Sequence, residues 1–443
     1  MSDPPRDPLE ARRLLTDAQA QAEAGRCQGC VDGACTRHCP LDVDVGAFIR
    51  HIRKENAAGA FRVLRSRNPM PETTALICPL EQICQGHCSN AQVSEAVNIG
   101  LLQRYAAHHG CRVRPPRQRS KRANDCKVAV VGGGPAGLAC VDRLVERGIG
   151  AEVFESCDEP GGALVRWIPP HRLPRDVVAR EVADILGADV PVRTGQALGR
   201  DFSLDDLLAR GFEAVFLATG LPSGVDGSLP GSDGPQVVQA LAYLEQHALG
   251  GAPVAGPNAV VVGGGNTAVD AAVCAKLAGA RDVYLVYRRS FGQMPAWYED
   301  RQRAVDAGVH VLILVRPVEC VRHQDGALAG VRCVRTELAD PVGQQRRKPM
   351  DLPETEFVLP ANLVILALGQ HLGAHLQAAL APLRFNPDGT LWTDPETRAT
   401  SRPNVYAGGD LANTDHTVVH ALADGLRAAD AIAKSLRSEA RAR

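Results

Sequence analysis

The chain has 443 residues, of which 45% are hydrophobic and 22% charged, and its formal net charge is −1. That length exceeds what a single hydrophobic core supports, so about three domains are expected. A nearly neutral chain argues against nucleic acid or an anionic membrane surface as the main partner. The N-terminus has no apolar stretch typical of a signal peptide, and no run of about 18 apolar residues occurs, so a cytoplasmic location is expected.

The first 125 residues combine apolar residues at helical spacing with half of the fourteen cysteines. These seven form the pattern Cys27-x2-Cys30-x4-Cys35-x3-Cys39-Pro40, then Cys78-Pro79-x4-Cys84-x3-Cys88. Thiolates at such short spacings, with prolines that interrupt regular structure, are typical ligands of cubane iron–sulfur clusters. The odd number argues against a disulfide framework, and one Cys-x2-Cys pair leaves structural zinc as the weaker alternative.

Two further features of this region have ordinary explanations. The stretch Arg112–Arg122 contains six basic residues and two prolines. We interpret it as a solvated linker, with a docking site for an acidic partner as the alternative. His38 and His87 stand beside cysteines of the pattern and are expected to be exposed loop residues rather than ligands.

From Lys127 the pattern changes to alternating strands and helices, which indicates a parallel α/β sheet. A strand over 127–131 is followed by a glycine-rich turn, a helix to about residue 147 and a strand over 151–155. The turn is a dinucleotide fingerprint consisting of Gly132, Gly133, Gly134, Pro135, Ala136 and Gly137. Its glycines allow a tight turn, close approach of a pyrophosphate and close helix packing. Glu155, at the end of the second strand, is predicted to bind a ribose hydroxyl.

A second copy of the pattern begins with a strand over 258–262 and continues with a helix to residue 278 and a strand over 282–288. Its turn consists of Gly263, Gly264, Gly265, Asn266, Thr267 and Ala268. The second strand here ends in Tyr287-Arg288-Arg289, without an acidic residue. Arginines at this place suit a 2′-phosphate, so NADP(H) is favoured over NAD(H). A segment over 318–338, with a turn at Asp325-Gly326, is predicted to form a β-hairpin within this copy.

Each copy is followed by a strand that ends in a small-residue turn, with Ala218 and Gly220 in the first and Gly369 in the second. A last strand leads to Gly409 and Asp410, and a helix is predicted over 417–436. Asp410 is placed to bind a ribityl chain, and the helix start at Thr417 and Val418 to face a flavin ring.

These patterns predict an α/β fold with two nested Rossmann-like dinucleotide-binding domains, preceded by an α-helical iron–sulfur domain. The expected domains are residues 1–125 for the clusters, 126–227 plus 367–443 for FAD, and 228–366 for NAD(P). The other seven cysteines are scattered singly, so the nucleotide folds contain no Cys-x-x-Cys pair for a dithiol mechanism.

Over nearly its full length the chain resembles the family of the glutamate synthase small subunit and the N-terminal half of dihydropyrimidine dehydrogenase. The spacing Cys78-Pro79-x4-Cys84-x3-Cys88 is similar to the dihydropyrimidine enzymes, whereas the usual glutamate synthase subunit has a shorter second group. The segment Asn98–Gln103 resembles the one in which those enzymes supply a glutamine as the eighth cluster ligand.

The resemblance implies that the helical domain holds two [4Fe-4S] clusters, and it implies a role for each matching residue. One cluster would be held by Cys27, Cys30, Cys35 and Cys88. The other would be held by Cys39, Cys78, Cys84 and Gln103. Flavin-binding positions would be Gly161, Gly162, Arg172 and Asp410, and nucleotide-binding positions Gly265, Asn266, Thr267, Arg288 and Arg289. Near Pro295 this chain lacks a further basic residue seen in NADPH-using relatives, which weakens the case for NADP(H).

The expected activity is that of an electron-input subunit without a catalytic side chain, in which hydride passes from NAD(P)H to FAD and single electrons leave through two clusters. No stretch remains for an FMN barrel, so the implied partner is an FMN and iron–sulfur subunit that reduces uracil or thymine. Three alternatives remain: a glutamate synthase small subunit, a donor to another iron–sulfur flavoenzyme, and a non-catalytic sensor with structural clusters.

Overall fold

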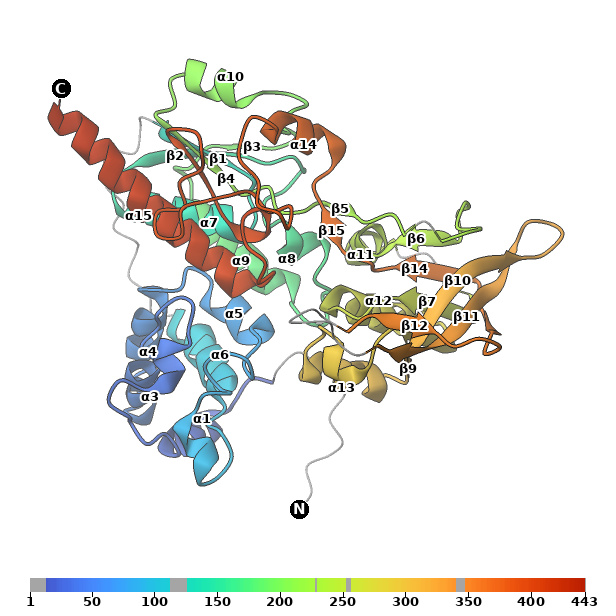
Figure 1. Cartoon of the computed structure of the whole chain (residues 1–443). Coiled ribbons are helices and arrows are strands. Elements are labelled where there is room, and N and C mark those ends of the chain that lie inside the picture. The colour runs from blue at the N-terminus through green and yellow to red at the C-terminus, as the bar shows by residue number, and fades with distance from the viewer. Residues whose placement is uncertain (1–12, 112–125, 228, 252–255, 340–346, 443) are drawn as a thin grey trace. The chain divides into compact units, whose positions relative to one another are not determined.

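The computed structural model describes residues 13–111, 126–227, 229–251, 256–339 and 347–442 (Figure 1). The basic stretch Arg112–Arg122 lies outside the described residues. The chain divides into two compact units. One is formed mainly by Pro222–His371 together with Val165–His171, and the other contains the N-terminal helices and the first nucleotide fold.

The cysteine-rich region is helical, as predicted. Its elements are α1 (Asp17–Gly25), α2 (Ala34–Arg37), α3 (Val45–Arg53), α4 (Ala57–Arg65), α5 (Pro71–Ile77), the 3-10 turn η1 (Ser89–Gln92) and α6 (Ile99–Gly110). Side chains of Asp44, Asn56 and Asn98 cap the N-termini of α3, α4 and α6 by accepting backbone N–H bonds. Cys35 lies in α2, and the other six cysteines of the pattern lie in the loops between these short helices.

The first nucleotide fold is a parallel sheet of five strands in the order β16-β4-β1-β2-β3. Its strands are β1 (Cys126–Val131), β2 (Gly150–Phe154), β3 (Val192–Arg193), β4 (Ala214–Leu217) and β16 (Val405–Ala407). Its helices are α7 (Pro135–Glu146), α8 (Ala163–Arg166), α9 (Arg175–Leu186), α10 (Leu204–Ala209), α14 (Ala374–Leu380), the 3-10 turn η4 (Gly409–Leu411) and α15 (Val418–Ala442). The strand β16 follows the second fold in sequence but pairs with β4 in the first, which confirms the nested arrangement.

The second nucleotide fold is another parallel five-stranded sheet, in the order β6-β14-β7-β8-β9. Its strands are β6 (Val237–Gln239), β7 (Asn258–Val262), β8 (Asp282–Tyr287), β9 (His310–Ile313) and β14 (Leu363–Leu366). Its helices are α11 (Ala240–Ala248), α12 (Asn266–Leu277), the 3-10 turn η3 (Phe291–Gln293) and α13 (Tyr298–Asp306). The short strands β5 (Ser223–Gly224) and β15 (Gln370–His371) pair antiparallel where the chain enters and leaves this fold.

The predicted hairpin is present and is part of a larger antiparallel sheet. The strands are β10 (Val315–Arg322), β11 (Leu328–Leu338), β12 (Pro349–Asp351) and β13 (Phe357–Pro360). Its tight turn contains Gly326 at φ +84°. This sheet covers one face of the second fold, because Val260 and Val262 of β7 pack with Val331 and Leu359 in one core. The alternate residue Val261 faces the helices, so the parallel sheet is buried on both sides.

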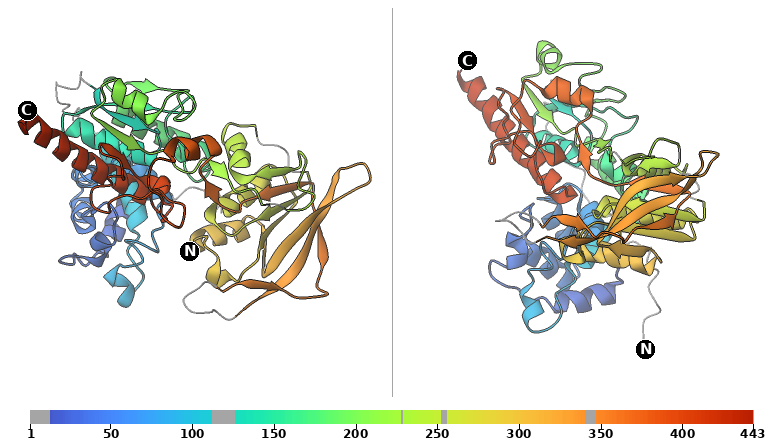
Figure 2. Two further views of the ribbon diagram at one scale, coloured as in Figure 1. Left: turned by 45° about the horizontal axis from the view of Figure 1, so that its top comes forward. Right: turned by 45° about the vertical axis from the view of Figure 1, so that its right-hand side comes forward.

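The long helix α15 lies against α7 of the first fold, as the views of Figure 2 also show. A Cβ on Gly425 would lie 2.1 Å from the carbonyl oxygen of Ala136, so only glycine allows this approach. No helix among the described residues has both the length and the apolar character needed to cross a membrane.

Candidate site for iron–sulfur, flavin and nicotinamide groups

Four of the N-terminal cysteines surround one cavity of about 420 Å³. They are Cys27, Cys30, Cys35 and Cys88. Burial raises the pKa of the Cys35 thiol, and the neighbouring thiols of Cys88 and Cys27 raise it further. Thiolates that disfavour one another in this way gain from a shared cation or cluster, because metal ligands bind in the deprotonated form. The structure therefore brings together the four residues implied for the first cluster, and they fit one.

A second group of thiols lies beside the first. Burial is the main cause that raises the pKa of both Cys39 and Cys84. For Cys84, whose pKa reaches about 12, the next causes include the charges of Cys39 and Cys35. The influence of Cys35 on Cys84 shows that the two groups are neighbours. Cys78 is buried at the C-cap of α5.

Gln103, on α6, is joined to the helix that ends at Cys78. Its Nε2 donates to the carbonyl oxygen of Pro71 and to the hydroxyl of Thr74, each at 2.8 Å. These partners identify the nitrogen end of the amide, and the carbonyl oxygen is the end that suits a metal. The role of Gln103 as a ligand stays a prediction.

His38 and His87 are exposed, as expected for loop residues. Their rings stack with centroids 3.5 Å apart and an interplanar angle of 10°. Nδ1 of His38 lies 2.8 Å from the carbonyl oxygen of Ala34.

The first glycine turn needs glycine for steric reasons. Gly132 has φ +106°, and a Cβ there would lie 2.3 Å from the carbonyl oxygen of Ala218. A Cβ on Gly137 would lie 1.9 Å from the carbonyl oxygen of Gly132. Gly134 is the N-cap residue of α7, and Pro135 occupies the first helical turn with Ala136. The turn thus exposes the N-terminus of α7, which is a site for a pyrophosphate.

Glu155 fixes this turn by accepting hydrogen bonds. Its Oε2 accepts from the backbone N–H of Gly133 at 2.8 Å, and its Oε1 accepts from that of Cys157 at 2.9 Å. Only 5% of its surface is exposed. A carboxylate offers about four lone-pair directions, and Gly133, Cys157 and the Ser156 hydroxyl use three of them, so one acceptor direction is left for a ribose hydroxyl. Binding of ribose by Glu155 stays a prediction.

The Gly161-Gly162 segment packs directly on the turn. The N–H of Gly161 donates to the carbonyl oxygen of Gly133 at 2.8 Å. Gly162 has φ +53°, and a Cβ there would lie 2.9 Å from the Cα of Gly134. The structure thus brings these two glycines, expected at flavin positions, to the pyrophosphate turn. Arg172 follows on the loop before α9, and its role stays a prediction.

The C-terminal turn is held by a residue that the sequence did not suggest. Asp424, on α15, accepts from the backbone N–H of Gly409 at 3.0 Å and from Asn413 Nδ2 at 2.7 Å. Its other oxygen pairs with Arg398 Nε at 3.0 Å. Asp424 is 2% exposed. In the sequence, the one indication of this role is that Asp424 is a charged residue between apolar residues of the helix.

Asp410 and Thr417 lie on either side of the loop that leads into α15. The His416 ring is 3.9 Å from Asp410 Oδ1, and this carboxylate is the main cause that raises the pKa of His416. Thr417 Oγ1 accepts from the N–H of His420 at 3.3 Å, so the threonine caps the helix that begins at Val418. Their contact with flavin stays a prediction.

The second glycine turn repeats the first with a different neighbour. A Cβ on Gly263 would lie 2.4 Å from the carbonyl oxygen of Ala367, whereas Gly265 has no atom within 4 Å of such a Cβ. Asn266 begins α12, and its Oδ1 accepts from the N–H of Trp297 at 3.0 Å. The open helix N-terminus, with Thr267 and Ala268 in its first turn, is again suited to a phosphate.

Tyr287, rather than either arginine, occupies the position that Glu155 has in the first fold. The N–H of Gly263 donates to Val286, as that of Gly132 donates to Phe154, and the following residue faces the turn. The ring of Tyr287 lies there against Gly264.

The two arginines come directly after Tyr287. Arg288 is exposed and Arg289 is half-buried. Arg289 Nε donates to the carbonyl oxygen of Arg347 at 3.2 Å, and Thr336 Oγ1 donates to the carbonyl oxygen of Arg288. The end of β8 therefore carries two cations directly after the residue that faces the glycine turn and, as predicted, no acid.

Residues 126–425 match the pyridine nucleotide-disulphide oxidoreductase family, and residues 7–114 match dihydropyrimidine dehydrogenase domain II, 4Fe-4S cluster. These matches define the class, an NAD(P)H-dependent iron–sulfur flavoprotein oxidoreductase. Within it, the chain belongs to the family of the glutamate synthase small chain and related oxidoreductases. The suspected family, the fold class and the predicted 4Fe-4S, FAD and NADP(H) cofactors are confirmed at this level.

Several curated relatives are similar over most of this chain. The Glutamate synthase [NADPH] small chain of Escherichia coli is 31% identical, over 97% of this chain and 96% of its own length. The NADP(+)-dependent formate dehydrogenase subunit beta of Moorella thermoacetica is 34% identical, over 92% of this chain but 60% of its own length. The Putative oxidoreductase AegA of Escherichia coli is 32% identical, with 65% of its length covered. The chain therefore spans less than two thirds of the latter two relatives.

Solved structures confirm the fold alone. FprA of Mycobacterium tuberculosis in complex with NADPH superposes with a TM-score of 0.58 at 18% identity, covering 71% of this chain and 85% of its own. The thioredoxin reductase of T. acidophilum superposes with a TM-score of 0.53 at 17% identity, covering 70% of this chain and 98% of its own.

Proposed function

We propose that this chain is the electron-input subunit of a larger oxidoreductase. When bound, FAD accepts a hydride from NADPH and passes electrons singly to two [4Fe-4S] clusters, and the side chains of this protein position these groups. The observation that carries the proposal is the cavity lined by Cys27, Cys30, Cys35 and Cys88. It lies in the same compact unit as the first glycine turn.

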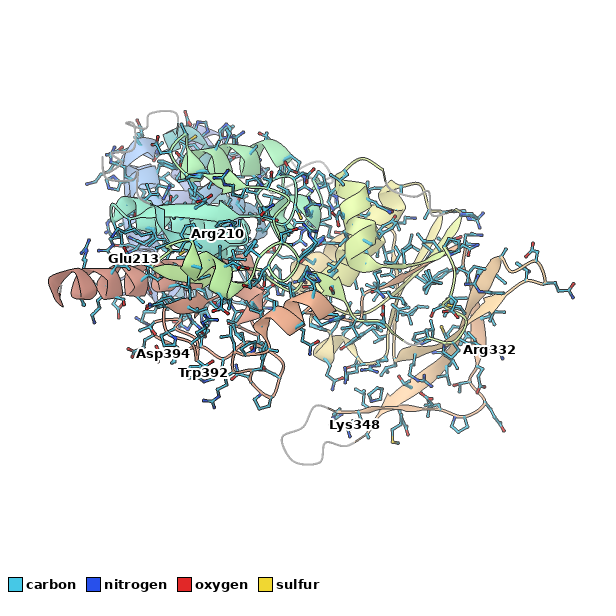
Figure 3. The ribbon with its side chains drawn as sticks, turned by 90° about the horizontal axis from the view of Figure 1, so that it is seen from above. Arg210, Glu213, Arg332, Lys348, Trp392 and Asp394 are labelled. Atoms are coloured by element: carbon cyan, nitrogen blue, oxygen red, sulfur yellow. The ribbon has the colours of Figure 1, made fainter. Side chains whose placement is uncertain are left out.

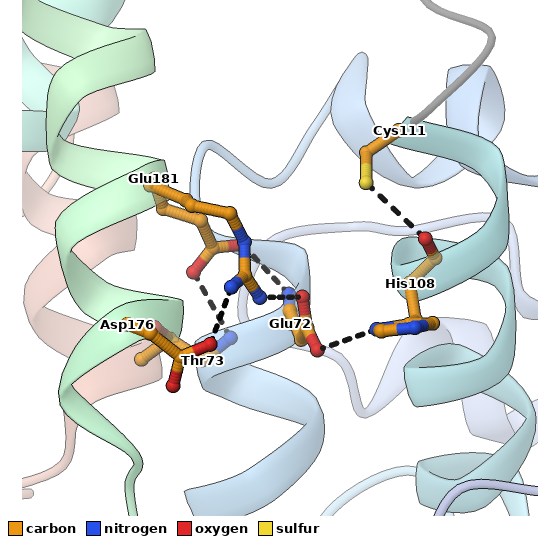
Figure 4. Close-up of polar contacts among 7 residues, drawn as sticks. Glu72, Thr73, His108, Cys111, Asp176 and Glu181 are labelled. Atoms are coloured by element: carbon orange, nitrogen blue, oxygen red, sulfur yellow. Dashed lines mark hydrogen bonds and ion pairs between the residues drawn. The ribbon is translucent and has the colours of Figure 1, made fainter.

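Direct contacts between helices support an electron route within this unit. Arg65 of α4 forms two hydrogen bonds with Asp142 of α7, at 2.6 and 2.8 Å. Glu181 of α9 accepts from the backbone N–H groups of Glu72 and Thr73, at the start of α5 (Figure 4). These contacts fasten the cysteine-bearing helices to the fold proposed for FAD, so a fixed distance between the cofactors is expected.

The proposed acceptor is an FMN and iron–sulfur subunit of the dihydropyrimidine dehydrogenase type, which reduces uracil or thymine. The longer spacing of the second cysteine group and Gln103 support this acceptor. So does the match of the N-terminal region to dihydropyrimidine dehydrogenase domain II. A second candidate is a glutamate synthase large subunit, which is favoured by the similarity over 96% of the Escherichia coli small chain.

The test begins with the chain purified without oxygen. Seven thiolates and Gln103 would hold about eight iron atoms per chain. In Cys30→Ser, NADPH should still reduce a dye that accepts electrons from flavin, but the paramagnetic signal of reduced clusters and transfer to a partner should be lost. Cys111→Ser, which changes a half-buried cysteine outside the pattern, is the matched control. Stoichiometric zinc without iron, or full transfer in Cys30→Ser, would overturn the proposal.

The acceptor is tested separately. The chain is mixed either with an FMN and iron–sulfur subunit of the dihydropyrimidine dehydrogenase type and uracil, or with a glutamate synthase large subunit, 2-oxoglutarate and glutamine. NADPH oxidation is followed in both mixtures. Uracil-dependent oxidation supports the dihydropyrimidine assignment. Oxidation that requires a glutamate synthase large subunit instead supports the second candidate.

A further inference from the structure

Three potential metal ligands meet in the unit that contains the second nucleotide fold, away from the cysteine pattern. They are His171 on the loop before α9, His247 on α11 and Cys274 on α12. One ligand atom from each lies within 4.8 Å of the other two. Three elements that are far apart in sequence thus bring two imidazoles and one thiol to a single point.

The distances suit a tetrahedral metal after a small movement. In a zinc site with bonds of about 2.0–2.3 Å, neighbouring donor atoms lie about 3.3–3.8 Å apart. Closing a separation of 4.8 Å to these values therefore requires each pair of donor atoms to approach by about 1.5 Å at most. Cys274 is fully buried and the two histidines are half-buried, so the three ligand atoms meet at the edge of the core.

The surroundings of Cys274 provide an independent indication. Tyr243, one helical turn before His247 on α11, is fully buried, and its hydroxyl has no hydrogen-bond partner among the described residues. Tyr243 and Cys274 belong to the same cluster of buried core residues, between α11 and α12. A buried hydroxyl without a partner is costly. A metal-bound thiolate, or water on a fourth metal position, would accept its hydrogen bond.

The loop that carries His171 is already held against α11. Arg166, on the same segment, forms an ion pair with Glu245, two residues before His247. Because this segment and α11 belong to one compact unit, the approach of His171 to His247 does not depend on how the two units are placed.

We propose that His171, His247 and Cys274 form a site for a borderline transition-metal ion, for which Zn²⁺ is the probe. Two imidazoles and one thiolate are typical zinc donors, and a fourth position is open to water. Bound metal would tie the segment before Arg172 to α11 and α12. The site is separate from the predicted cluster ligands and does not depend on the proposed electron transfer.

The experiment uses the full chain with its clusters and FAD, so that the cysteines of the pattern are occupied by iron. After removal of loosely bound metal, the protein is dialysed against limiting Zn²⁺, and zinc and iron are counted in the same sample. Wild type should bind about one zinc with its iron unchanged. Cys274→Ser and His247→Gln should each bind at least about ten-fold more weakly, since each removes a ligand. Cys333→Ser, a buried cysteine of the same unit, should bind like wild type.

X-ray absorption at the zinc edge then identifies the donors. One sulfur and two imidazole nitrogens per zinc are expected. No stoichiometric zinc, a zinc bound by sulfur alone, or equal binding by the His247→Gln variant would overturn the proposal. His247→Gln keeps the test decisive if Cys274→Ser, at a buried helical position, does not fold.

Discussion

The two nucleotide folds share the same backbone but differ in what faces their glycine turns. In both, the first glycine approaches a carbonyl oxygen of the small-residue turn, Ala218 at 2.3 Å in the first and Ala367 at 2.4 Å in the second. In the first fold the buried carboxylate of Glu155 holds the turn, whereas in the second the ring of Tyr287 lies there and the arginines follow. The two folds therefore share a backbone turn suited to a phosphate. They differ in the residues at the end of the second strand, and these residues are expected to determine which dinucleotide binds.

The folds also differ in how they are fastened. The first fold shares a compact unit with the cysteine-bearing helices and is joined to them by Arg65–Asp142 and by Glu181. The second fold forms a unit mainly with its own antiparallel sheet. Variants in the first fold should therefore affect FAD and the clusters, and variants in the second fold only the nicotinamide nucleotide.

The largest effect on cofactor binding is expected from Gly137→Val. Because even a Cβ would lie 1.9 Å from the carbonyl oxygen of Gly132, the helix must move away from the turn. Overpacking of this kind costs about 1–3 kcal/mol, so FAD should bind at least about ten-fold more weakly. The FAD content after desalting measures this. The control is Gly265→Ala in the second turn. Gly265 has φ −88° and open space around a Cβ, so this variant should keep its FAD. Equal FAD content in both variants would show that the first turn is not the flavin site.

The largest effect on the free energy of unfolding is expected from breaking the buried ion pair of Arg65 and Asp142. Asp142 is 2% exposed, and without it Arg65 would keep, among the described residues, the ion pair with Asp184 at 3.5 Å and the more distant charge of Glu146. Asp142→Ala should lower the free energy of unfolding by about 3–5 kcal/mol. Urea unfolding followed by flavin fluorescence measures it.

The control for this variant is an exposed ion pair of the same fold. Glu213→Ala removes the partner of Lys127 at the N-terminal ends of the neighbouring strands β1 and β4, and Figure 3 labels Glu213. Because exposed pairs contribute about 0–1 kcal/mol, this change should be small. A loss below about 1 kcal/mol in Asp142→Ala as well would mean that the buried pair does not fasten the helices.

A smaller and more selective effect is expected at the end of β8. Arg288→Ala combined with Arg289→Ala should lower the kcat/KM for NADPH by about 10–100-fold, because charge-assisted bonds to a 2′-phosphate contribute about 1.5–3 kcal/mol each before desolvation. The kcat/KM for NADH should hardly change. Arg332→Ala, on the antiparallel sheet in Figure 3 and paired with Glu319, is the control. If wild type already prefers NADH, these arginines do not read a phosphate.

The features that could be predicted from the sequence are those determined by residues close to one another along the chain. The strand over 258–262 is observed at the predicted residues, and the glycine turns and the nested order follow from local motifs with fixed spacing. The structural roles of Asp424 and Glu181 could not be predicted, because their hydrogen-bond partners are distant in sequence. Gly409 lies 15 residues from Asp424, and Thr73 lies 108 residues from Glu181. Likewise the position of Tyr287 opposite Gly264 follows from strand register, which the sequence alone does not determine.

The smallest effect concerns pH and is expected only in the unit that contains the first fold. Loss of hydration raises the pKa of Glu181 to about 7 from an ordinary value of 4.5. The folded protein therefore holds a proton that the unfolded chain releases between about pH 4.5 and 7, and the free energy of unfolding decreases as the pH rises through this window. In Glu181→Gln this dependence of the free energy of unfolding on pH should weaken by an amount that corresponds to up to one proton. The urea midpoints of flavin release between pH 5 and 8 measure it.

The control for the pH experiment lies on the same helix. Asp176 is exposed and pairs with Arg180, which lowers the pKa of its carboxyl. Its stabilising charge is lost only as the pH falls below the ordinary range of a carboxyl group, so Asp176→Asn should leave the slope between pH 5 and 8 unchanged. An unchanged slope in Glu181→Gln would mean that the carboxylate is already ionised at pH 5. In that case the two N–H groups of α5 outweigh the loss of hydration, and Glu181 acts as an ordinary charged cap of the helix that leads to Cys78.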